Sequence, residues 1–437
     1  MSESVAREPR FGGRDGAAMA DRGQLVAQFE SVRSFTLSLC APLVPEDYVL
    51  QAMPDVSPTR WHLAHTTWFF ERFILQEALA DYEPWDERYY FLFNSYYHTV
   101  GPMHSRPKRG ELSRPTVDEI GAYRAEIDGR LCKLISACDD VTLARIAPLI
   151  ILGCHHEQQH QELILTDIKY NLSRNPLLPA YSEAPTGGGA PASVEQGWIA
   201  FDGGIREIGF AGPGFCFDNE GPRHEVLLHS YALATRPVTN AEFLAFVEDG
   251  GYERSELWLD LGHATVVEQG WQHPLYWLRD RGDWMQYTLA GPVPLAGAEP
   301  ICHVSFFEAD AFARWAGYRL PSEAEWEVAA ARAPVAGNLA DSRRFHVEAA
   351  APDSGADLRQ VYGDVWEWTA SPYLGYPGYQ PPPGAVGEYN GKFMCNQYVL
   401  RGGSCATPPG HLRPTYRNFF PPEARWQFSG LRLAADA

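Results

Sequence analysis

Two histidines one helical turn apart are the residues of this chain best suited to chemistry. His156 and His160 lie within an apolar-periodic segment that runs from about residue 142 to residue 172. Side chains four residues apart share one face of an α-helix, so both imidazoles can bind one transition metal ion. A second pair, His62 and His65, lies far upstream in another helical pattern, residues 58–79. Two helices that direct histidines at one point predict a metal site inside a helical bundle.

The neighbours of His156 favour a buried metal site over a solvated helix face. An apolar run, residues 149–154, precedes the histidine pair and predicts that this part of the helix is deeply placed. Polar residues next to the pair can hydrogen-bond the ligands and fix their orientation. These residues are Glu157, Gln158, Gln159 and Glu162.

Four helical patterns in the first half predict the bundle that positions these histidines. They cover residues 24–43, 58–79, 116–138 and 142–172. Ser57 and Pro58 form a helix start signal, and Thr116 with Glu119 has the spacing of a capping box. Pro148 is expected to kink the fourth helix or to delay its start. The connection at residues 81–115 is longer than structureless loops usually are, which indicates a functional role.

A stretch rich in proline and glycine, residues 176–197, is a linker by its composition. Beyond it, short β-like runs such as 224–228 and 398–401 alternate with turns rich in Gly, Pro, Trp and Tyr. Helices are expected at residues 239–248 and 308–317, and a third begins at about residue 321. This second half, residues 198–437, is therefore predicted to be an α+β domain, following an all-α domain at residues 22–175.

The amino-acid composition limits which classes of binding partner and which cellular compartment are expected. The chain has 437 residues and a formal net charge of −19, which excludes a phosphate-backbone partner and disfavours an anionic membrane surface. No apolar run approaches the roughly 20 residues that a spanning helix needs. Residues 1–21 are charged and rich in Gly and Ala, and they read as a disordered extension without the apolar core of a signal peptide. Eight scattered cysteines without CxxC pairs favour the reducing cytoplasm.

Motifs in both halves resemble one known family. Residues 57–65 and 156–162 resemble the DinB-like, iron-binding half of the sulfoxide synthases of ergothioneine biosynthesis, the EgtB-like hercynine oxygenases. The second half resembles their formylglycine-generating-enzyme-like domain, which has a C-type-lectin-like fold and is related to sulfatase-modifying factor. The stretches that carry the second resemblance are residues 236–240, 319–327, 363–369, 401–404 and 430–432.

The resemblance implies a non-heme iron(II) oxygenase. Carried over position by position, the iron ligands fall on His65, His156 and His160, whereas His62 is not a ligand. The implied reaction joins a sulfur donor, cysteine by expectation, to the imidazole carbon C2 of hercynine as a sulfoxide, with O2 as oxidant. Iron(II) is the implied cofactor because zinc cannot change its oxidation state, although zinc would also fit three histidines.

The resemblance also assigns the remaining site residues. Tyr96 and Tyr97, in the long connection, match paired tyrosines that donate a proton, with Tyr97 slightly favoured. Arg106 and Arg109 match arginines that bind the carboxylate of the thiol substrate, a task that suits a planar guanidinium. The hercynine pocket is expected to use Asn418, Phe419 and Phe420 near the C-terminus, with Gln159 next to the iron-bound imidazole. Aromatic faces suit the trimethylammonium group of hercynine.

Several alternatives remain open at this point. Cys405 follows Ser404 directly and no second cysteine comes after it, so the copper-dependent activity of formylglycine-generating enzymes is not expected. His98, Met103 and His104 depart from the usual thiol loop. This departure keeps a selenoneine synthase, which joins selenium from a selenosugar to hercynine, as the second hypothesis. A zinc-dependent DinB-type thiol transferase and a non-catalytic lectin-like binding protein are remoter hypotheses, which metal analysis would separate.

Overall fold

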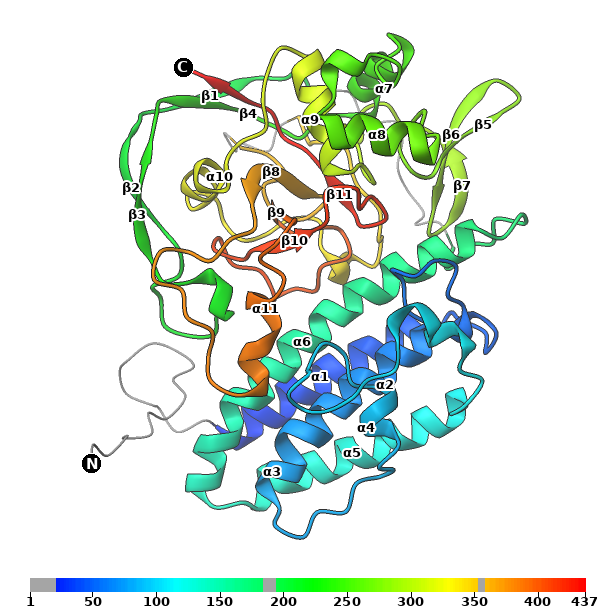
Figure 1. The fold of residues 1–437 in the computed structure, drawn as a ribbon, viewed down its shortest axis with the longest axis vertical. Helices are drawn as coiled ribbons and strands as arrows, with labels where there is room; N and C mark the ends of the chain where they lie inside the picture. Colours follow the sequence, from blue (N-terminus) through cyan, green and yellow to red (C-terminus); the bar gives the residue numbers. More distant parts are fainter. Residues whose placement is uncertain (1–20, 184–193, 353–357) are drawn as a thin grey trace. The chain divides into compact units, whose positions relative to one another are not determined.

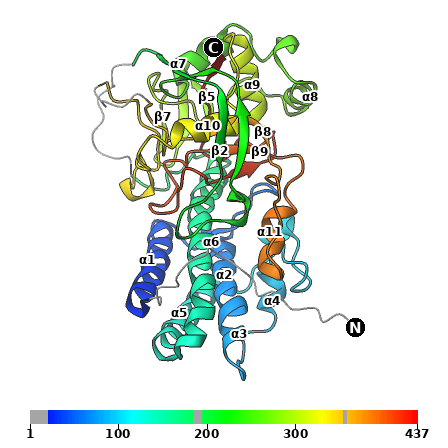
Figure 2. The same cartoon turned by 90° about the vertical axis from the view of Figure 1, so that its left-hand side faces the viewer.

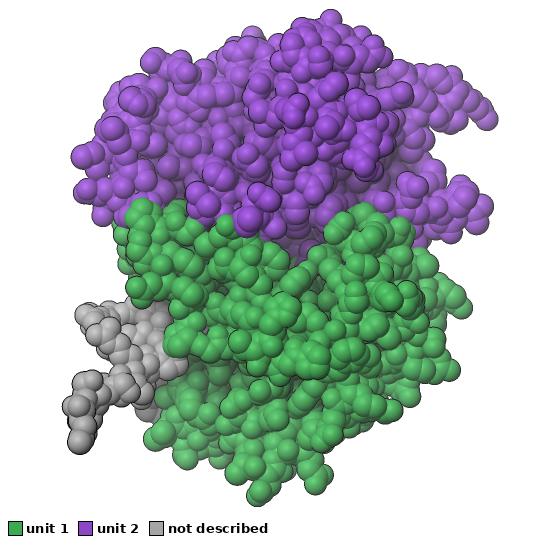
Figure 3. All heavy atoms as spheres, viewed as in Figure 1, with its two compact units in different colours: residues 1–160, 209–223, 375–394 green, residues 161–208, 224–374, 395–437 purple. Residues whose placement is uncertain are grey.

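The chain divides into two compact units (Figure 3). The computed structural model describes residues 21–183, 194–352 and 358–437. Unit 1 comprises Met1–His160, Gly209–Arg223 and Gly375–Met394, and the remaining residues form unit 2. The predicted disordered extension lies outside the described residues except for Asp21, and so do residues 184–193 of the predicted linker. Unit 1 therefore combines the helical first half with two segments from far along the chain.

Four long helices lie side by side in unit 1, as both ribbon views show (Figures 1 and 2). Their bounds are Arg22–Cys40 (α1), Thr59–Phe70 (α2), Val117–Ala137 (α5) and Asp140–Ser173 (α6). The last of them, α6, belongs to unit 1 up to His160 and to unit 2 from Gln161 onwards. The predicted helical bundle is confirmed.

Side-chain caps explain where α1, α5 and α6 begin, whereas α2 begins after Pro58 without a side-chain cap. The Asp21 side chain accepts from the backbone of Gln24 at the start of α1, and Thr116 and Glu119 form the capping box expected for α5. At the start of α6 the Asp139 carboxylate accepts from the Thr142 backbone at 2.7 Å. The helix thus begins two residues before the predicted start. Pro148 lies inside α6 and does not delay its start, because a proline removes only one of the many hydrogen bonds of a 34-residue helix.

The long connection between α2 and α5 carries structure of its own. After α2 the chain continues through a π-helical turn, Glu71–Leu75 (η2), and one further turn, Gln76–Ala78 (α3). The connection then forms Tyr89–Leu92 (α4) and a 3-10 helix, Arg106–Glu111 (η3). The two distant segments of unit 1 add short helices of the same kind. These are Asp218–Glu220 (η4), Ala385–Gly387 (η7) and Glu388–Gly391 (α11).

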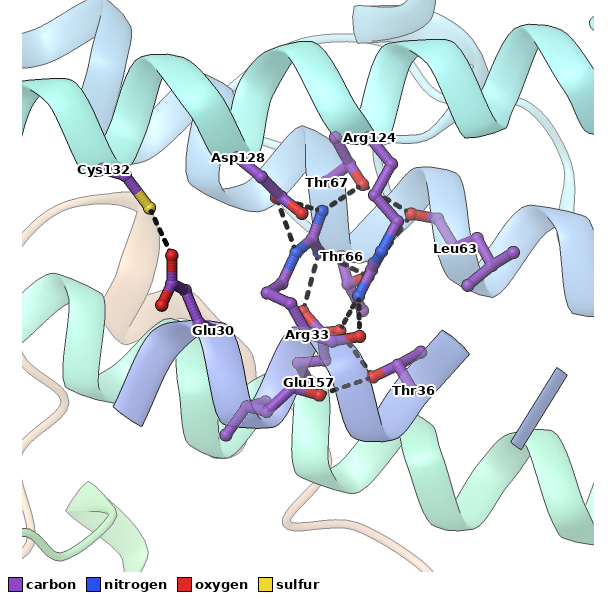
Figure 4. Close-up of polar contacts among 11 residues, drawn as sticks. Glu30, Arg33, Thr36, Leu63, Thr66, Thr67, Arg124, Asp128, Cys132 and Glu157 are labelled. Atoms are coloured by element: carbon purple, nitrogen blue, oxygen red, sulfur yellow. Dashed lines mark hydrogen bonds and ion pairs between the residues drawn. The ribbon is translucent and has the colours of Figure 1, made fainter. Parts of the chain in front are cut away.

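A buried carboxylate joins all four helices at the centre of the bundle (Figure 4). Glu157 of α6 is fully buried and accepts from Arg33 of α1 at 2.8 Å and from Arg124 of α5. Arg33 also donates to Thr67 of α2 at 2.9 Å and to Asp128 of α5 at 2.7 Å. Burial alone would raise the pKa of Glu157, but the charges of Arg124 and Arg33 outweigh it and lower the pKa to about 2.

Unit 2 consists of small sheets and short helices, which confirms the α+β character of the second half. Its strands form the sheets β1-β4-β12, β2-β3, β5-β6-β7 and β10-β9-β8-β11 in the described part of the chain. Their bounds are Trp198–Phe201 (β1), Gly204–Ile208 (β2), His224–Leu228 (β3), Tyr231–Ala234 (β4), Trp277–Asp280 (β5), Asp283–Thr288 (β6), Gly291–Pro294 (β7), Trp366–Pro372 (β8), Tyr398–Arg401 (β9), Asn418–Phe420 (β10), Ser429–Gly430 (β11) and Ala434–Asp436 (β12). Its helices are Asn240–Glu248 (α7), Asp260–Gln269 (α8), Phe306–Trp315 (α9) and Glu323–Ala330 (α10).

The part of α6 that belongs to unit 2 is fixed there by one half-buried carboxylate. Glu162 accepts from the indole of Trp366 at 2.8 Å and from the hydroxyls of Ser404 and Thr407 at 2.5 and 2.7 Å. The predicted linker is also partly packed, since Tyr181 is buried and donates its backbone N–H to Leu289 at 2.8 Å. None of the helices in the described ranges combines the length and the apolar character that crossing a lipid bilayer requires.

Replacement of the central carboxylate should destabilise unit 1. We expect Glu157→Gln to lower the free energy of unfolding by about 3–5 kcal/mol, because it leaves two buried guanidinium groups without their common anion. Urea unfolding followed by circular dichroism measures this change. The matched control is Glu126→Gln, which removes an exposed ion pair with Arg130 on α5 and should cost less than about 1 kcal/mol. Equal effects of the two variants would contradict the central role of Glu157.

Candidate metal centre

The structure brings the three predicted ligands together inside unit 1. His65 comes from α2, and His156 and His160 come from α6. One ring nitrogen of each histidine lies within 4.8 Å of those of the other two, and all three side chains are buried. The Nε2 atoms of His65 and His156 are 3.2 Å apart. Three imidazoles arranged in this way are able to hold one metal ion.

Hydrogen bonds on the far side of two of the rings determine which nitrogen faces the cluster. His65 donates from Nδ1 to the backbone carbonyl of Phe93 at 2.6 Å, which leaves its Nε2 with a lone pair. The Nδ1 atom of His160 lies 2.8 Å from Nδ1 of His62, which is also buried. The structure therefore places His62 behind the cluster, in contact with a ligand candidate, where it can orient the His160 ring.

The three imidazoles are uncharged near neutral pH. Burial lowers the pKa of His156 to about 4. Burial, together with repulsion from the neighbouring imidazole of His156, also lowers the pKa values of His65 and His160 well below the usual value. A neutral imidazole has a free lone pair on one nitrogen, so the site needs no loss of protons before it binds a cation.

The geometry fits a metal ion of the size that histidines bind. Two nitrogens that each lie about 2.1 Å from one ion are about 3.0 Å apart at a right angle and about 3.4 Å apart at a tetrahedral angle. The observed separation of 3.2 Å between His65 and His156 lies between these values. Three buried imidazoles with this spacing are a donor set that suits a transition metal ion.

Aromatic rings hold the His65 imidazole in its plane. The ring stacks on Trp61 with centroids 4.6 Å apart at 11°, and on Trp68 with centroids 5.6 Å apart at 18°. The guanidinium of Arg109 lies 3.3 Å from the Trp61 ring centroid. This stack restricts rotation of His65, so the direction of its Nε2 lone pair is fixed before any ligand arrives.

A pocket opens next to the cluster, and all the residues that line it belong to unit 1. Metal-ligand candidate His156 forms part of its wall, as does Gln159. The complete lining is Phe69, Tyr97, Leu152, His156, Gln159, Phe215, Cys216, Phe217, Asp218, Pro382, Val386, Tyr389 and Asn390. A largely aromatic wall with a few polar groups beside a metal site is typical of an active site.

The two tyrosine candidates have different surroundings. Tyr97 is buried and lines the pocket, where burial raises the pKa of its hydroxyl well above the usual value, so the hydroxyl keeps its proton. Tyr96 is half-buried, does not line the pocket, and accepts a hydrogen bond from Arg106 at 2.8 Å. Of the pair, only Tyr97 is among the residues that line the pocket, and proton donation by either tyrosine stays a prediction.

Neither arginine candidate is among the residues that line this pocket. Arg106 donates to the hydroxyl of Tyr96 and to the backbone carbonyl of Asp55. Arg109 is buried and donates to the hydroxyls of Ser57 and Ser95 at 2.8 and 2.9 Å. The binding of a substrate carboxylate by these arginines stays a prediction.

The predicted hercynine-binding residues at the C-terminus form strand β10 of unit 2. All three are half-buried. Asn418 accepts from the backbone of Phe419 at 2.9 Å, and Phe419 stacks on Tyr373 with ring centroids 4.0 Å apart. Their role in binding a quaternary ammonium group stays a prediction.

The pocket also has residues from the second half of the chain, which the sequence patterns did not predict. Phe215, Cys216, Phe217 and Asp218 form one wall, and Tyr389 and Asn390 form another. Asp218 joins the two walls, because its carboxylate accepts from the side chains of Asn390 and Tyr379. The sequence feature that could have indicated this wall is residues 215–218, where two aromatic residues, a thiol and a carboxylate lie in a loop between glycines and prolines.

Comparisons with known proteins match both halves of the chain. The DinB superfamily model matches residues 28–164, and the sulfatase-modifying factor enzyme 1-like domain model matches residues 188–437. The hercynine oxygenase of Mycolicibacterium smegmatis is 35% identical, with 88% of this chain and 92% of that protein covered. The hercynine oxygenase of Mycolicibacterium thermoresistibile is 32% identical over 96% of each chain. The formylglycine-generating enzyme of Streptomyces coelicolor is 31% identical, covering 59% of this chain and 95% of that protein.

Removal of the histidine behind the cluster should weaken metal binding without abolishing it. We expect His62→Ala to lower the affinity for a divalent metal by about 10- to 100-fold, because the His160 ring loses the partner that orients it. Competition with a chromophoric chelator measures the affinity. Under the same conditions His160→Ala should abolish binding, and His229→Ala, at an exposed position in unit 2, should have no effect. Unchanged affinity in His62→Ala would contradict an orienting role for His62.

Proposed function

The chain belongs to the hercynine oxygenase family, and we propose that it is a non-heme iron(II)-dependent oxygenase that couples a sulfur donor to hercynine. The observation that carries this proposal is the cluster of His65, His156 and His160 next to an aromatic pocket. The donor proposed is cysteine. The overall change is that the C2–H of hercynine, a thiol and O2 give the C2–sulfoxide and one molecule of water. O2 accepts four electrons, two from forming the C–S bond and two from oxidising sulfur.

The proposed metal is iron(II), held by the three neutral imidazoles. Bound there, iron would supply the electron transfer that O2 reduction needs and would acidify a coordinated thiol. The protein contributes the fixed direction of the ligands, through the Phe93 carbonyl behind His65 and His62 behind His160. These contacts restrict the orientation of both rings, which would preorganise the ligand set.

The walls of the pocket fit the two ends of hercynine. Aromatic faces attract a quaternary ammonium group, which has no hydrogen to donate, and Phe215, Phe217 and Tyr389 supply such faces within unit 1. A carboxylate in the same wall, Asp218, adds negative charge. Gln159, on the same face of α6 as His156, is proposed to hydrogen-bond the imidazole of hercynine. Asn418, Phe419 and Phe420 remain proposed contributors to the binding of the cation.

Tyr97 is proposed as the proton donor of the reaction. Tyr97 lines the pocket, and a tyrosine hydroxyl carries its proton at neutral pH. That proton can be delivered to oxygen as it is reduced, and contacts with the rings of Trp68 and Phe73 hold the Tyr97 side chain in position. Tyr96 is proposed to support this step indirectly through its hydrogen bond with Arg106. Arg106 and Arg109 remain the proposed binding residues for the carboxylate of the donor.

Aerobic turnover of the iron(II)-loaded protein with hercynine tests the proposed reaction directly. Cysteine, γ-glutamylcysteine and a selenosugar are offered in parallel, and the products are identified by mass spectrometry. We expect a hercynine–cysteine sulfoxide adduct, formed only in the presence of iron and O2. Selenoneine formed from the selenosugar alone would reassign the donor. Tightly held zinc without O2 consumption would overturn the oxygenase proposal.

Removal of the Tyr97 hydroxyl should slow coupling more than it affects substrate binding. We expect Tyr97→Phe to lower kcat for sulfoxide formation by about 10²–10⁴-fold, the usual contribution of a positioned acid, and to divert thiol to simple oxidation. The matched control is Tyr318→Phe, which removes a hydroxyl from an exposed tyrosine of unit 2. Wild-type kcat in Tyr97→Phe would show that another group donates the proton.

A further inference from the structure

The loop that carries the tyrosine pair is held by a short helix encoded nearly 300 residues later. We call residues 94–104 the tyrosine loop. Glu388, the first residue of α11, accepts from the backbone of His98 at 3.0 Å and from the backbone of Thr99 at 3.2 Å. The Thr99 hydroxyl donates to the same carboxylate at 2.8 Å. One carboxylate therefore receives three hydrogen bonds from two consecutive residues of the tyrosine loop, all within unit 1.

The backbone of the tyrosine loop needs such support because it is strained at Tyr96. This residue has a φ of 67°, in the left-handed region that a bulky side chain adopts at a cost of about 1–2 kcal/mol. Lys392, one turn after Glu388, donates to the Tyr96 carbonyl and pairs with Glu388 at 3.1 Å. The Tyr96 backbone N–H reaches the sulfur of Met103 at 3.3 Å. These contacts offset the strain at the residue that precedes Tyr97.

Ring contacts continue from α11 to both tyrosines. The Tyr389 ring lies 6.1 Å from Tyr96 and 6.5 Å from Tyr97 between centroids, and the Phe393 ring lies 5.0 Å from Tyr96. The next residue of α11, Asn390, donates to Asp218 in the opposite pocket wall. Helix α11 is fixed on one side to Asp218 and on the other side to the tyrosine loop. Loss of the Glu388 carboxylate would release the tyrosine loop from α11 and so alter the position of Tyr97.

We propose that Glu388 is a positioning residue for Tyr97: its carboxylate holds the tyrosine loop against α11, so that the Tyr97 side chain keeps its place in the pocket wall. This inference rests on the proposed function in one respect, namely that Tyr97 donates a proton during coupling. The charge of Glu388 also contributes, after burial and Tyr389, to the raised pKa of Tyr97, which is consistent with their proximity.

The position of Tyr97 matters because two outcomes compete in the pocket. Coupling requires the proton to arrive where oxygen is reduced while hercynine and the thiol are both in place. A displacement of about 1 Å in a reacting group can cost about 100-fold in rate. A displaced Tyr97 would leave the oxidation of thiols to disulfides as the easier reaction, since it needs no contact with hercynine. In that reaction O2 accepts four electrons from four thiols, which gives two disulfides and two molecules of water. Glu388 would thus affect which product forms.

The test compares Glu388→Ala, which removes both acceptor oxygens, with Glu388→Gln, which keeps one. Glu87→Ala is the matched control, because Glu87 is an exposed glutamate of unit 1 in the same connection between α2 and α5. Hydrogen–deuterium exchange of the peptide that covers residues 94–104 measures how firmly the loop is held. Steady-state kinetics with hercynine and cysteine gives kcat, KM and the ratio of sulfoxide to disulfide. Metal affinity is measured for each variant.

We expect Glu388→Ala to speed exchange in the tyrosine loop by about tenfold or more, since hydrogen bonds to a charged acceptor are lost, while exchange in α5 and metal affinity stay unchanged. In the same variant kcat for coupling and the ratio of sulfoxide to disulfide should both fall about tenfold, with Glu388→Gln intermediate and Glu87→Ala like wild type. Unchanged exchange in the loop would overturn the proposal. Faster exchange with an unchanged product ratio would also overturn it.

If the wild type makes no sulfoxide, the proposed function fails, and Glu388 then has no reaction in which to position Tyr97. The exchange result still decides whether Glu388 holds the tyrosine loop.

Discussion

The ion-pair network of Glu157 is the interaction on which the metal centre depends. Its carboxylate binds guanidinium groups from α1 and α5, and Arg33 extends the network to α2. Glu157 directly follows the ligand candidate His156 in α6. The charges that bind Glu157 therefore restrict the rotation of α6 about its axis, and with it the direction of His156 and His160. A purely apolar core would tolerate small rotations that this network excludes.

The sequence was most informative where a local rule acts. The capping box at Thr116 predicted the start of α5 closely, because a side-chain cap specifies a helix start within a few residues. For α2 the predicted Ser57 cap is wrong by one residue: Pro58 is the N-cap and supplies no side-chain hydrogen bond, whereas the Ser57 hydroxyl accepts from Arg109. The i, i+4 spacing of His156 and His160 predicted a shared face, which the cluster confirms. The start of α6 was set two residues too late, since the cap at Asp139 lies in an acidic pair without apolar periodicity.

The pocket could not be predicted from the same rules. Its walls from residues 215–218 and 389–390 come from loops, where neither helical nor strand periodicity indicates which way a side chain points. Their approach to the bundle depends on hydrogen bonds between residues far apart in the chain, such as Asp218 with Asn390 and Glu388 with Thr99. His62 shows the same limit: the family resemblance excludes it as a ligand, and only the folded chain reveals its contact with His160.

Two stretches of unit 1 supply different parts of the candidate site, and this affects how the sequence of such a protein can change. All three imidazoles of the cluster are encoded before residue 161, whereas much of the pocket wall is encoded after residue 208. Mutations in the later loops can change the shape and charge of the cavity while the cation-holding residues and their supporting network stay intact. Mutations can therefore change which small molecules the pocket binds while the histidine cluster is kept. Division of the gene between the helical domain and the α+β domain would separate the histidine cluster from the later loops that line the pocket.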